Sequence, residues 1–382
     1  MQLNEQLLST LETPCLVIDV DQARRNITAM QQAADAAHCR LRPHIKTHKM
    51  SLFARMQVEA GAAGITCAKI SEAEVMASGG LDDIFIAYPM VGSFRIKRAI
   101  ELARRIKRLI LAVDSLVGAE ALNAAALKEK LRLEVRLEID TGAQRTGVRI
   151  EDAPTLAEAV SKMPGLKLTG IYTFKGLTYQ GKPTDDNDAA AVEEAALMER
   201  AAQEIEARGI TLKDISGGSS PTGLAVARTG TVNEIRPGTY IFKDLLLCNE
   251  HVAEIPEIAV RFVATVVSCP DKEYAIIDGG TKCFPTDQIL NAEPFYYTGY
   301  ARVEGATPSV SGLYPERLRL DRMNEEHGII RSVTGKTGLT VGQILTLIPI
   351  HVCTAINMQN TVYLLENGTL RREPVEARGM LV

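Results

Sequence analysis

Short apolar runs alternate with longer stretches of helical periodicity over the first two thirds of the chain. The apolar runs predict strands at 14–19, 41–46, 65–69, 84–88, 109–114, 133–140, 166–174, 212–216 and 234–236. Between them, the periodic stretches predict helices at 21–38, 51–60, 71–78, 94–105, 116–130, 153–162 and 188–208. Strands that alternate with helices form right-handed βαβ units on a parallel sheet. Roughly eight such units over about 230 residues predict an α/β fold of the (β/α)8 TIM-barrel type.

The pattern changes after about residue 245. Segments at 260–268, 274–278, 296–303 and 344–349 have the composition of strands, and no helical period separates them. They predict a second, mostly β domain. We therefore expect a barrel over residues 14–245 and a β-rich domain formed by residues 1–13 and 246–382.

Composition narrows the classes of function. The net charge of −4, an aromatic content of only 5% and the absence of Trp argue against nucleic-acid binding. No stretch approaches the ~18 apolar residues of a membrane helix. Seven scattered cysteines and the lack of a run resembling a signal peptide predict reduced thiols in a cytoplasmic protein. No glycine-rich dinucleotide loop, P-loop or nucleophile elbow is present.

The basic segment Arg42-Pro43-His44-Ile45-Lys46-Thr47-His48-Lys49 ends the second predicted strand. The strands of such a barrel end at its catalytic face, so Lys46 is expected at the mouth. A lysine there, partly desolvated and close to other cations, has a lowered pKa and can form a Schiff base. Taken alone, the segment is also compatible with a basic loop in solvent.

Three further loops follow predicted strands. Asp140–Gly147 (DTGAQRTG) permits a tight turn that presents Arg145, whose guanidinium can hold an anionic oxygen. Ile215–Thr222 (ISGGSSPT) and Arg236–Tyr240 (RPGTY) combine small residues with hydroxyls, and late barrel loops of this kind often hold phosphate. The first loop alone is equally compatible with an ordinary turn, and loops like the other two usually have no ligand.

The sequence His351-Val352-Cys353 ends an apolar run. In an extended strand, residues two apart lie on the same face, so an imidazole and a thiolate would stand side by side. Such a pair supplies two ligands of a zinc-like site. The alternative is a buried cysteine beside an unrelated histidine.

Together these motifs resemble one family, the alanine-racemase-type pyridoxal-phosphate enzymes, and within it the D-threonine aldolase/D-serine dehydratase branch. The resemblance covers nearly the whole chain, from Thr13-Pro14 into the C-terminal domain. It implies an alanine-racemase-type N-terminal barrel, Lys46 as the cofactor lysine and Arg145 at the phenolic oxygen of the cofactor. It also implies Arg236 at the pyridine nitrogen, and His351 and Cys353 as ligands of a divalent metal. The phosphate contacts it implies come from Ser220, Thr222, Gly238 and Thr239.

Two details distinguish this sequence within the branch. The His-x-Cys form resembles D-serine dehydratase and 3-hydroxyaspartate dehydratase and favours zinc, whereas D-threonine aldolases more often show His-x-Asp. Relatives commonly carry a histidine where this chain has Phe174, whose ring can stack on the cofactor but cannot form a hydrogen bond. The next residue, Lys175, either meets an acidic substrate group or reaches solvent.

The resemblance implies a pyridoxal 5'-phosphate- and metal-dependent lyase. Its substrate would be a β-hydroxy D-amino acid, such as D-serine, D-threonine or 3-hydroxy-D-aspartate, which loses water to give a 2-oxo acid and ammonia. Retro-aldol cleavage to glycine and an aldehyde is the alternative, followed by racemisation. A non-enzymatic cofactor carrier is disfavoured because such proteins are typically single barrels. We also expect a homodimer, with no nucleic-acid or membrane partner.

Overall fold

The computed structural model describes residues 3–290, 292–306, 318–333 and 335–382. The chain forms two compact units. Unit 1 consists of Met1–Asn26, Thr47–Lys49 and Thr239–Gly379, and unit 2 of Ile27–Lys46, Met50–Gly238 and Met380–Val382. These units differ from the predicted domains chiefly because residues 14–26 and 239–245 belong to unit 1.

Unit 2 contains an eight-stranded sheet among the described residues, and all its strand pairs are parallel. In spatial order, its strands are β2 (Arg40–Leu41), β11 (Glu234–Ile235), β10 (Asp214–Gly217), β7 (Leu166–Tyr172), β6 (Leu133–Glu138), β5 (Arg108–Val113), β4 (Asp83–Pro89) and β3 (Ile65–Cys67). A parallel bridge between His44 and Thr66 joins the two ends of this order. The result is the predicted barrel of parallel strands.

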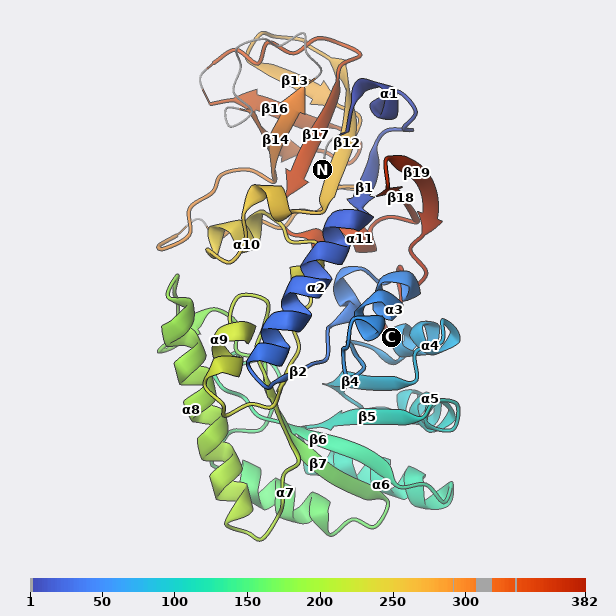
Figure 1. Ribbon diagram of the computed structural model, residues 1–382, viewed down its shortest axis with the longest axis vertical. Coiled ribbons are helices and arrows are strands. Elements are labelled where there is room, and N and C mark those ends of the chain that lie inside the picture. The colour runs from blue at the N-terminus through green and yellow to red at the C-terminus, as the bar shows by residue number, and fades with distance from the viewer. Residues whose placement is uncertain (1–2, 291, 307–317, 334) are drawn as a thin grey trace. The chain divides into compact units, whose positions relative to one another are not determined.

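Helices connect the barrel strands. They are α2 (Val20–Ala36), α3 (Ser51–Glu59), α4 (Ile70–Ser78), α5 (Ser93–Ala103), α6 (Leu116–Lys128), α7 (Ala153–Ser161), α8 (Asn187–Glu206) and α9 (Gly223–Arg228). Figure 1 shows α4, α5 and α6 beside strands β4 to β7. The short strands β8 (Thr178–Tyr179) and β9 (Lys182–Pro183) form a hairpin between β7 and α8. Because all the strands run in the same direction, the loops that follow them all begin at the same edge of the barrel.

A buried ion network crosses the barrel interior. Arg42 donates to Glu234 at 2.9 Å, and Arg136 donates to Glu234 and, at 3.0 Å, to Asp214. Burial alone would raise the pKa of Glu234, but the two guanidinium groups hold it well below its ordinary value. The network therefore links β6, β10, β11 and the end of β2, whose following loops carry most of the predicted cofactor residues.

Unit 1 contains a nine-stranded sheet within the described residues. Its strands run in the order β13 (Tyr274–Ile277), β16 (Gly328–Ser332), β15 (Leu318–Met323), β14 (Ala301–Ala306), β17 (Ile344–Pro349), β12 (Val260–Ser268), β1 (Cys15–Asp19), β18 (Thr361–Glu366) and β19 (Thr369–Pro374). An additional pairing of β13 with β12 closes the first six strands into an antiparallel barrel. Unit 1 also contains helices α1 (Glu5–Leu8), α10 (Leu245–Asn249) and α11 (Val352–Asn357) and the short 3-10 helices η2 (Thr239–Ile241) and η3 (Ile255–Glu257).

Three predicted elements differ from the structure. The first strand, β1, pairs with β12 and β18 in unit 1 and not with the barrel. The strand predicted at 41–46 is shorter in the structure, where β2 ends at Leu41, and Lys46 lies in the 3-10 helix η1 (Ile45–Thr47). The predicted strand at 296–303 is observed as β14, which begins at Ala301. The sequence of an apolar strand does not specify which strands it pairs with. For this reason the sequence pattern alone wrongly placed β1 in the barrel.

Two further predictions concern membrane helices and cysteines. Over the residues that the structure describes, no helix combines the length and the apolar character needed to cross a bilayer. All seven cysteines are present as free thiols.

Candidate active site

Three of the predicted cofactor residues converge in unit 2. The Lys46 Nζ atom lies 5.7 Å from the centre of the Phe174 ring, and the Arg145 guanidinium lies 4.2 Å from the same centre. These residues follow β2, β6 and β7, so they come from three different strand ends. A lysine and an arginine gathered around one aromatic ring provide a nucleophilic amine, a hydrogen-bond donor and an apolar surface for a flat ligand.

The loop that presents Arg145 is held by the side chain of Asp140. The Asp140 carboxylate accepts hydrogen bonds from the N–H groups of Gly142 at 2.9 Å and Gln144 at 3.1 Å. Gly147 has a φ of +107°, and a Cβ added there would lie 2.7 Å from the backbone nitrogen of Asp140. Glycine is therefore required at this point, and the turn fixes the position of Arg145.

Arg236 is fixed at the end of β11. Its guanidinium donates to the Ser216 hydroxyl at 2.5 Å and to the backbone carbonyl of Thr173. Ser216 in turn donates to Glu234 at 2.9 Å. Burial lowers the pKa of Arg236, although Glu234 opposes this shift. These two hydrogen bonds fix the orientation of the guanidinium, so the direction of its remaining N–H donors is fixed as well.

The two predicted phosphate loops meet. The N–H of Gly238 donates to the Ser220 hydroxyl at 3.2 Å, and the hydroxyls of Ser219 and Thr222 lie 2.9 Å apart. Beneath this loop, the fully buried Glu194 of α8 accepts a hydrogen bond from the N–H of Gly218 at 2.6 Å. Backbone N–H groups and hydroxyls on small residues form a cradle of the kind that accepts phosphate oxygens.

The predicted metal pair lies in unit 1. His351 is the residue before α11 and Cys353 is in its first turn, so the pair stands at a helix start and not in the extended strand that the sequence suggested. β17 ends at Pro349, two residues before His351. The imidazole and the thiol still interact with each other, which brings the two predicted ligands together.

Other side chains of unit 1 surround this pair. The Asp244 carboxylate lies 3.1 Å from His351 Nδ1 and accepts the N–H of Val352 at 2.9 Å. The hydroxyls of Thr47 and Thr239 lie 3.2 Å and 3.7 Å from Cys353 Sγ. Because Asp244 engages Nδ1, the other ring nitrogen of His351 is the one that would bind a metal ion.

The pKa of His351 reflects these neighbours. Burial alone would lower it, but Cys353 and Asp244 raise it to about 11. An imidazole and a thiol are the donors that zinc prefers, so this pair fits a divalent metal of that kind. No group of three or more metal-binding side chains is found among the described residues.

Comparison with known proteins identifies the family. Residues 18–245 match the alanine racemase N-terminal domain, and residues 259–365 match the putative serine dehydratase domain. The chain is 35% identical over 358 residues to D-threo-3-hydroxyaspartate dehydratase from Delftia sp. strain HT23, across 91% of this chain and 93% of that relative. This chain belongs to the alanine-racemase-like D-serine dehydratase/D-threonine aldolase family.

Solved structures agree with this assignment. The Delftia dehydratase superimposes with a TM-score of 0.87 at 34% identity and covers 96% of this chain and 98% of its own. D-threonine aldolase from Filomicrobium marinum gives a TM-score of 0.84 at 26% identity, with 97% of each chain covered. The alanine-racemase-like fold is thus shared over essentially the full length.

Within this alanine-racemase-like chain, the structure assigns Lys175 neither of its expected surroundings. Its side chain is buried, and its ammonium pairs with Glu193 at 2.7 Å and donates to the carbonyl of Thr178. The lysine therefore ties the segment after β7 to helix α8.

Two residues of the metal pair's surroundings were not predicted. Asp244 lies 107 positions from His351, and nothing in its own sequence context marks it as a partner. Thr47 belongs to the RPHIKTHK segment, but only its place beside Cys353 reveals a role. Pairings over such separations depend on the fold, and a single sequence does not display them.

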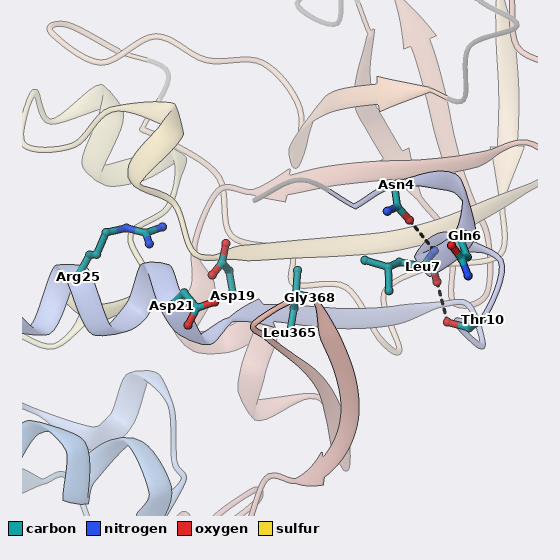
Figure 2. A pocket seen from close by; sticks show the side chains of 9 residues that line it. All are labelled: Asn4, Gln6, Leu7, Thr10, Asp19, Asp21, Arg25, Leu365 and Gly368. Carbon is teal, nitrogen blue, oxygen red and sulfur yellow. Dashed lines mark hydrogen bonds between the residues drawn. The ribbon is translucent and has the colours of Figure 1, made fainter.

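A separate cavity of about 520 Å³ lies in unit 1, and none of the predicted site residues lines it (Figure 2). Its two carboxylates serve the local backbone: Asp19 accepts the N–H of Gln22 at 2.8 Å, and Asp21 accepts the N–H of Asn367 at 3.0 Å. The lining consists of Asn4, Gln6, Leu7, Thr10, Asp19, Asp21, Arg25, Leu365 and Gly368. We therefore assign the cavity no part in the candidate chemistry.

Proposed function

We propose that this protein is a pyridoxal-phosphate- and zinc-dependent lyase that removes water from a β-hydroxy D-amino acid. The products would be a 2-oxo acid and ammonia. The observation that carries this proposal is the pairing of His351 with Cys353, oriented by Asp244, in a chain that also gathers Lys46 and Arg145 around Phe174.

The residues of unit 2 fit pyridoxal phosphate. Lys46 would carry the cofactor, Phe174 would face its ring, and Arg145 would donate to its phenolic oxygen. Ser220, Thr222 and Gly238 would contact its phosphate, with the Gly238 N–H already directed at Ser220. Thr239, which belongs to unit 1, is the fourth predicted phosphate contact. When bound, the cofactor supplies an electron sink for charge that develops at the substrate's α carbon.

Two side chains of unit 2 control protons at this centre. Lys46 Nζ, once it is free of the cofactor, would remove the proton from the substrate's α carbon. Arg236 would donate to the pyridine nitrogen, and a guanidinium does not release its proton, so that nitrogen would stay unprotonated. The weaker electron sink that results leaves more of the barrier to be lowered at the departing hydroxyl.

The metal would be held by His351 and Cys353. When bound, it supplies a Lewis acid for the departing β-hydroxyl group. In support, one structure that matches this chain is a cysteine-to-alanine variant of D-threo-3-hydroxyaspartate dehydratase in a metal-free form, at 34% identity and a TM-score of 0.87. Thr47 would stabilise the thiolate form of Cys353 by donating its hydroxyl hydrogen at 3.2 Å.

Retro-aldol cleavage is the second candidate. Its support is a relative described as 3-hydroxy-D-aspartate aldolase from Paracoccus denitrificans strain Pd 1222, which is 29% identical over 381 residues. In that reaction a base removes the β-hydroxyl proton, and the bond between the α and β carbons breaks to give glycine and an aldehyde. The His-Cys pair favours the dehydratase over this alternative.

A product assay separates the two candidates. The purified protein is incubated with D-serine, D-threonine and D-threo-3-hydroxyaspartate, each with and without added zinc. We expect ammonia and a 2-oxo acid to appear without glycine. Glycine with an aldehyde would replace the proposal by the aldolase reaction, and an absence of both product sets would refute the lyase proposal.

A further inference from the structure

Lys69 lies at the strand end next to that of Lys46. β3 ends at Cys67, two residues before Lys69, and Thr66 of β3 forms a parallel bridge with His44, two residues before Lys46. Neighbouring strands lie about 4.8 Å apart, and parallel strands end at the same edge. Both lysines therefore follow adjacent strands at the edge where the predicted cofactor residues gather.

Tyr88 of the next strand, β4, holds the Lys69 side chain in place. The ammonium nitrogen lies 3.5 Å from the centre of the Tyr88 ring. A cation at this distance over an aromatic face is attracted by the ring but keeps its full charge and its hydrogen-bond donors. The contact positions the ammonium without neutralising it.

Several buried cations of unit 2 are paired with a carboxylate, and Lys69 is not one of them. Lys175 is paired with Glu193, and Arg42 with Glu234. Across the described parts of the chain, the Lys69 ammonium lies over the Tyr88 ring and forms no ion pair with a carboxylate. A half-buried cation held by a ring is a ready partner for a ligand carboxylate.

The exposure of this pair indicates which carboxylate it meets. Tyr88 is 39% exposed, so the pair stands on the solvent side of the strand ends. The reacting α carbon would lie at Lys46, whereas the far end of a substrate side chain extends toward the rim. A second carboxylate, on the β carbon, therefore matches the place of Lys69 better than the α-carboxylate common to all amino acids.

We infer that Lys69, positioned by Tyr88, binds a carboxylate in the substrate's side chain and selects dicarboxylic β-hydroxy D-amino acids over serine- and threonine-like ones. This inference rests on the proposed function for the place of the substrate. It assigns the choice between substrates to the positive charge of Lys69, which has no role in the proposed reaction itself.

The test measures binding separately from turnover. The holoenzyme is titrated with D-aspartate and with D-alanine while the cofactor absorbance is followed, since neither ligand has a hydroxyl group to eliminate. We expect the unaltered enzyme to bind D-aspartate more tightly. Lys69→Met should weaken D-aspartate binding about 10- to 100-fold, the usual consequence of losing a charge-assisted hydrogen bond, and D-alanine binding less than about threefold.

Matched variants exclude a structural cause. Lys69→Arg keeps the charge and should retain most of the preference for D-aspartate. Lys128→Met removes the same charge from the exposed end of α6, at the opposite edge of the barrel, and should change neither affinity. Tyr88→Phe keeps the ring and should preserve the preference, whereas Tyr88→Leu should reduce it.

Equal losses for the two ligands in Lys69→Met, or no preference for D-aspartate in the unaltered enzyme, would overturn the inference. Failure of the proposed lyase reaction has a different signature. In that case the product assay is negative, but the selectivity between D-aspartate and D-alanine still depends on Lys69.

Discussion

At the scale of single residues, the site depends on side chains that hold the reactive groups in place. Asp244 accepts hydrogen bonds from the N–H of Leu247 at 3.0 Å and of Val352 at 2.9 Å, and its carboxylate also faces His351. One carboxylate therefore caps helix α10, anchors the start of α11 and sets the orientation of the imidazole. Such indirect partners of a metal contribute to affinity almost as clearly as the ligands.

Replacing Asp244 by alanine should weaken zinc binding about 10- to 100-fold, because the His351 ring loses the partner that fixes it. Asp186→Ala is the matched control, since Asp186 also caps a helix by accepting an N–H, that of Ala189, at 2.8 Å. Both variants should lose about 1 kcal/mol of stability with the cap. Zinc titration of both variants checks this, and equal zinc affinities would contradict the role of Asp244.

The protonation of Glu194 affects how the stability of the protein depends on pH. Burial raises its pKa above the ordinary 4.5, although the Gly218 N–H bond opposes the shift. A carboxyl group with a raised folded-state pKa contributes stability at low pH, and this contribution is lost as the pH rises through that pKa.

Glu194→Gln should therefore become more stable relative to the unaltered protein as the pH rises above about 4.5, by up to about 1.4 kcal/mol per pH unit. Glutamine keeps an oxygen for the Gly218 N–H but does not ionise. Urea unfolding of both proteins at several pH values between about 5 and 8 measures the difference. A difference that stays constant with pH would show that Glu194 is ionised in the folded state.

At the scale of elements, the turn between β10 and α9 determines how closely a phosphate can approach. Gly218 has a φ of +74°, and a Cβ added there would lie 2.7 Å from the Cα of Gly223. Gly230, just after α9, has a φ of +76°, but a Cβ there would meet nothing within 4 Å. The two glycines share a conformation and differ in their surroundings.

Gly218→Ala should lower the affinity for pyridoxal phosphate by at least about tenfold, because the displaced loop loses hydrogen bonds to a charged group. Its affinity for pyridoxal, which has no phosphate, should change much less. Gly230→Ala has the same backbone cost and should affect neither ligand. Equal losses for the phosphorylated and unphosphorylated ligands in Gly218→Ala would place the phosphate elsewhere.

The sequence predicted most barrel elements within a few residues, because apolar periodicity follows local geometry. It predicted Lys46, Arg145 and Phe174 at strand ends, and the structure gathers them around one ring. It failed where tertiary contacts decide. β1 joins the other sheet, and His351 caps helix α11 although the apolar run before it predicts a continuing strand. Asp244 had no local signal, since its partner is distant in the chain.

At the scale of the whole molecule, the residues predicted to hold the cofactor and the metal are distributed between the two units. Lys46, Arg145, Ser220, Thr222 and Gly238 belong to unit 2, whereas Thr239, His351 and Cys353 belong to unit 1. Cofactor binding and metal binding are therefore expected to be separable by mutation. The homodimer and the cytoplasmic location stay predictions from the sequence.

Cys353→Ala should abolish the lyase reaction and zinc binding while the cofactor absorbance persists. Removal of the metal by a chelator should reproduce this result in the unaltered protein, with recovery when zinc is restored. Cys269→Ala is the control and should keep full activity. The thiol of Cys269 lies 3.5 Å from the carbonyl of Leu339, away from the predicted metal pair. Lyase activity that survives in chelated Cys353→Ala would refute the role of the metal.

The most direct test of the account locates the cofactor on the chain. The purified protein is reduced with borohydride, which fixes pyridoxal phosphate to the lysine that carries it, and is then digested for peptide mapping by mass spectrometry. We predict the label on Lys46, and no label in Lys46→Ala. A label on another lysine, such as Lys69 or Lys175, or no label on any peptide, would contradict the central claim.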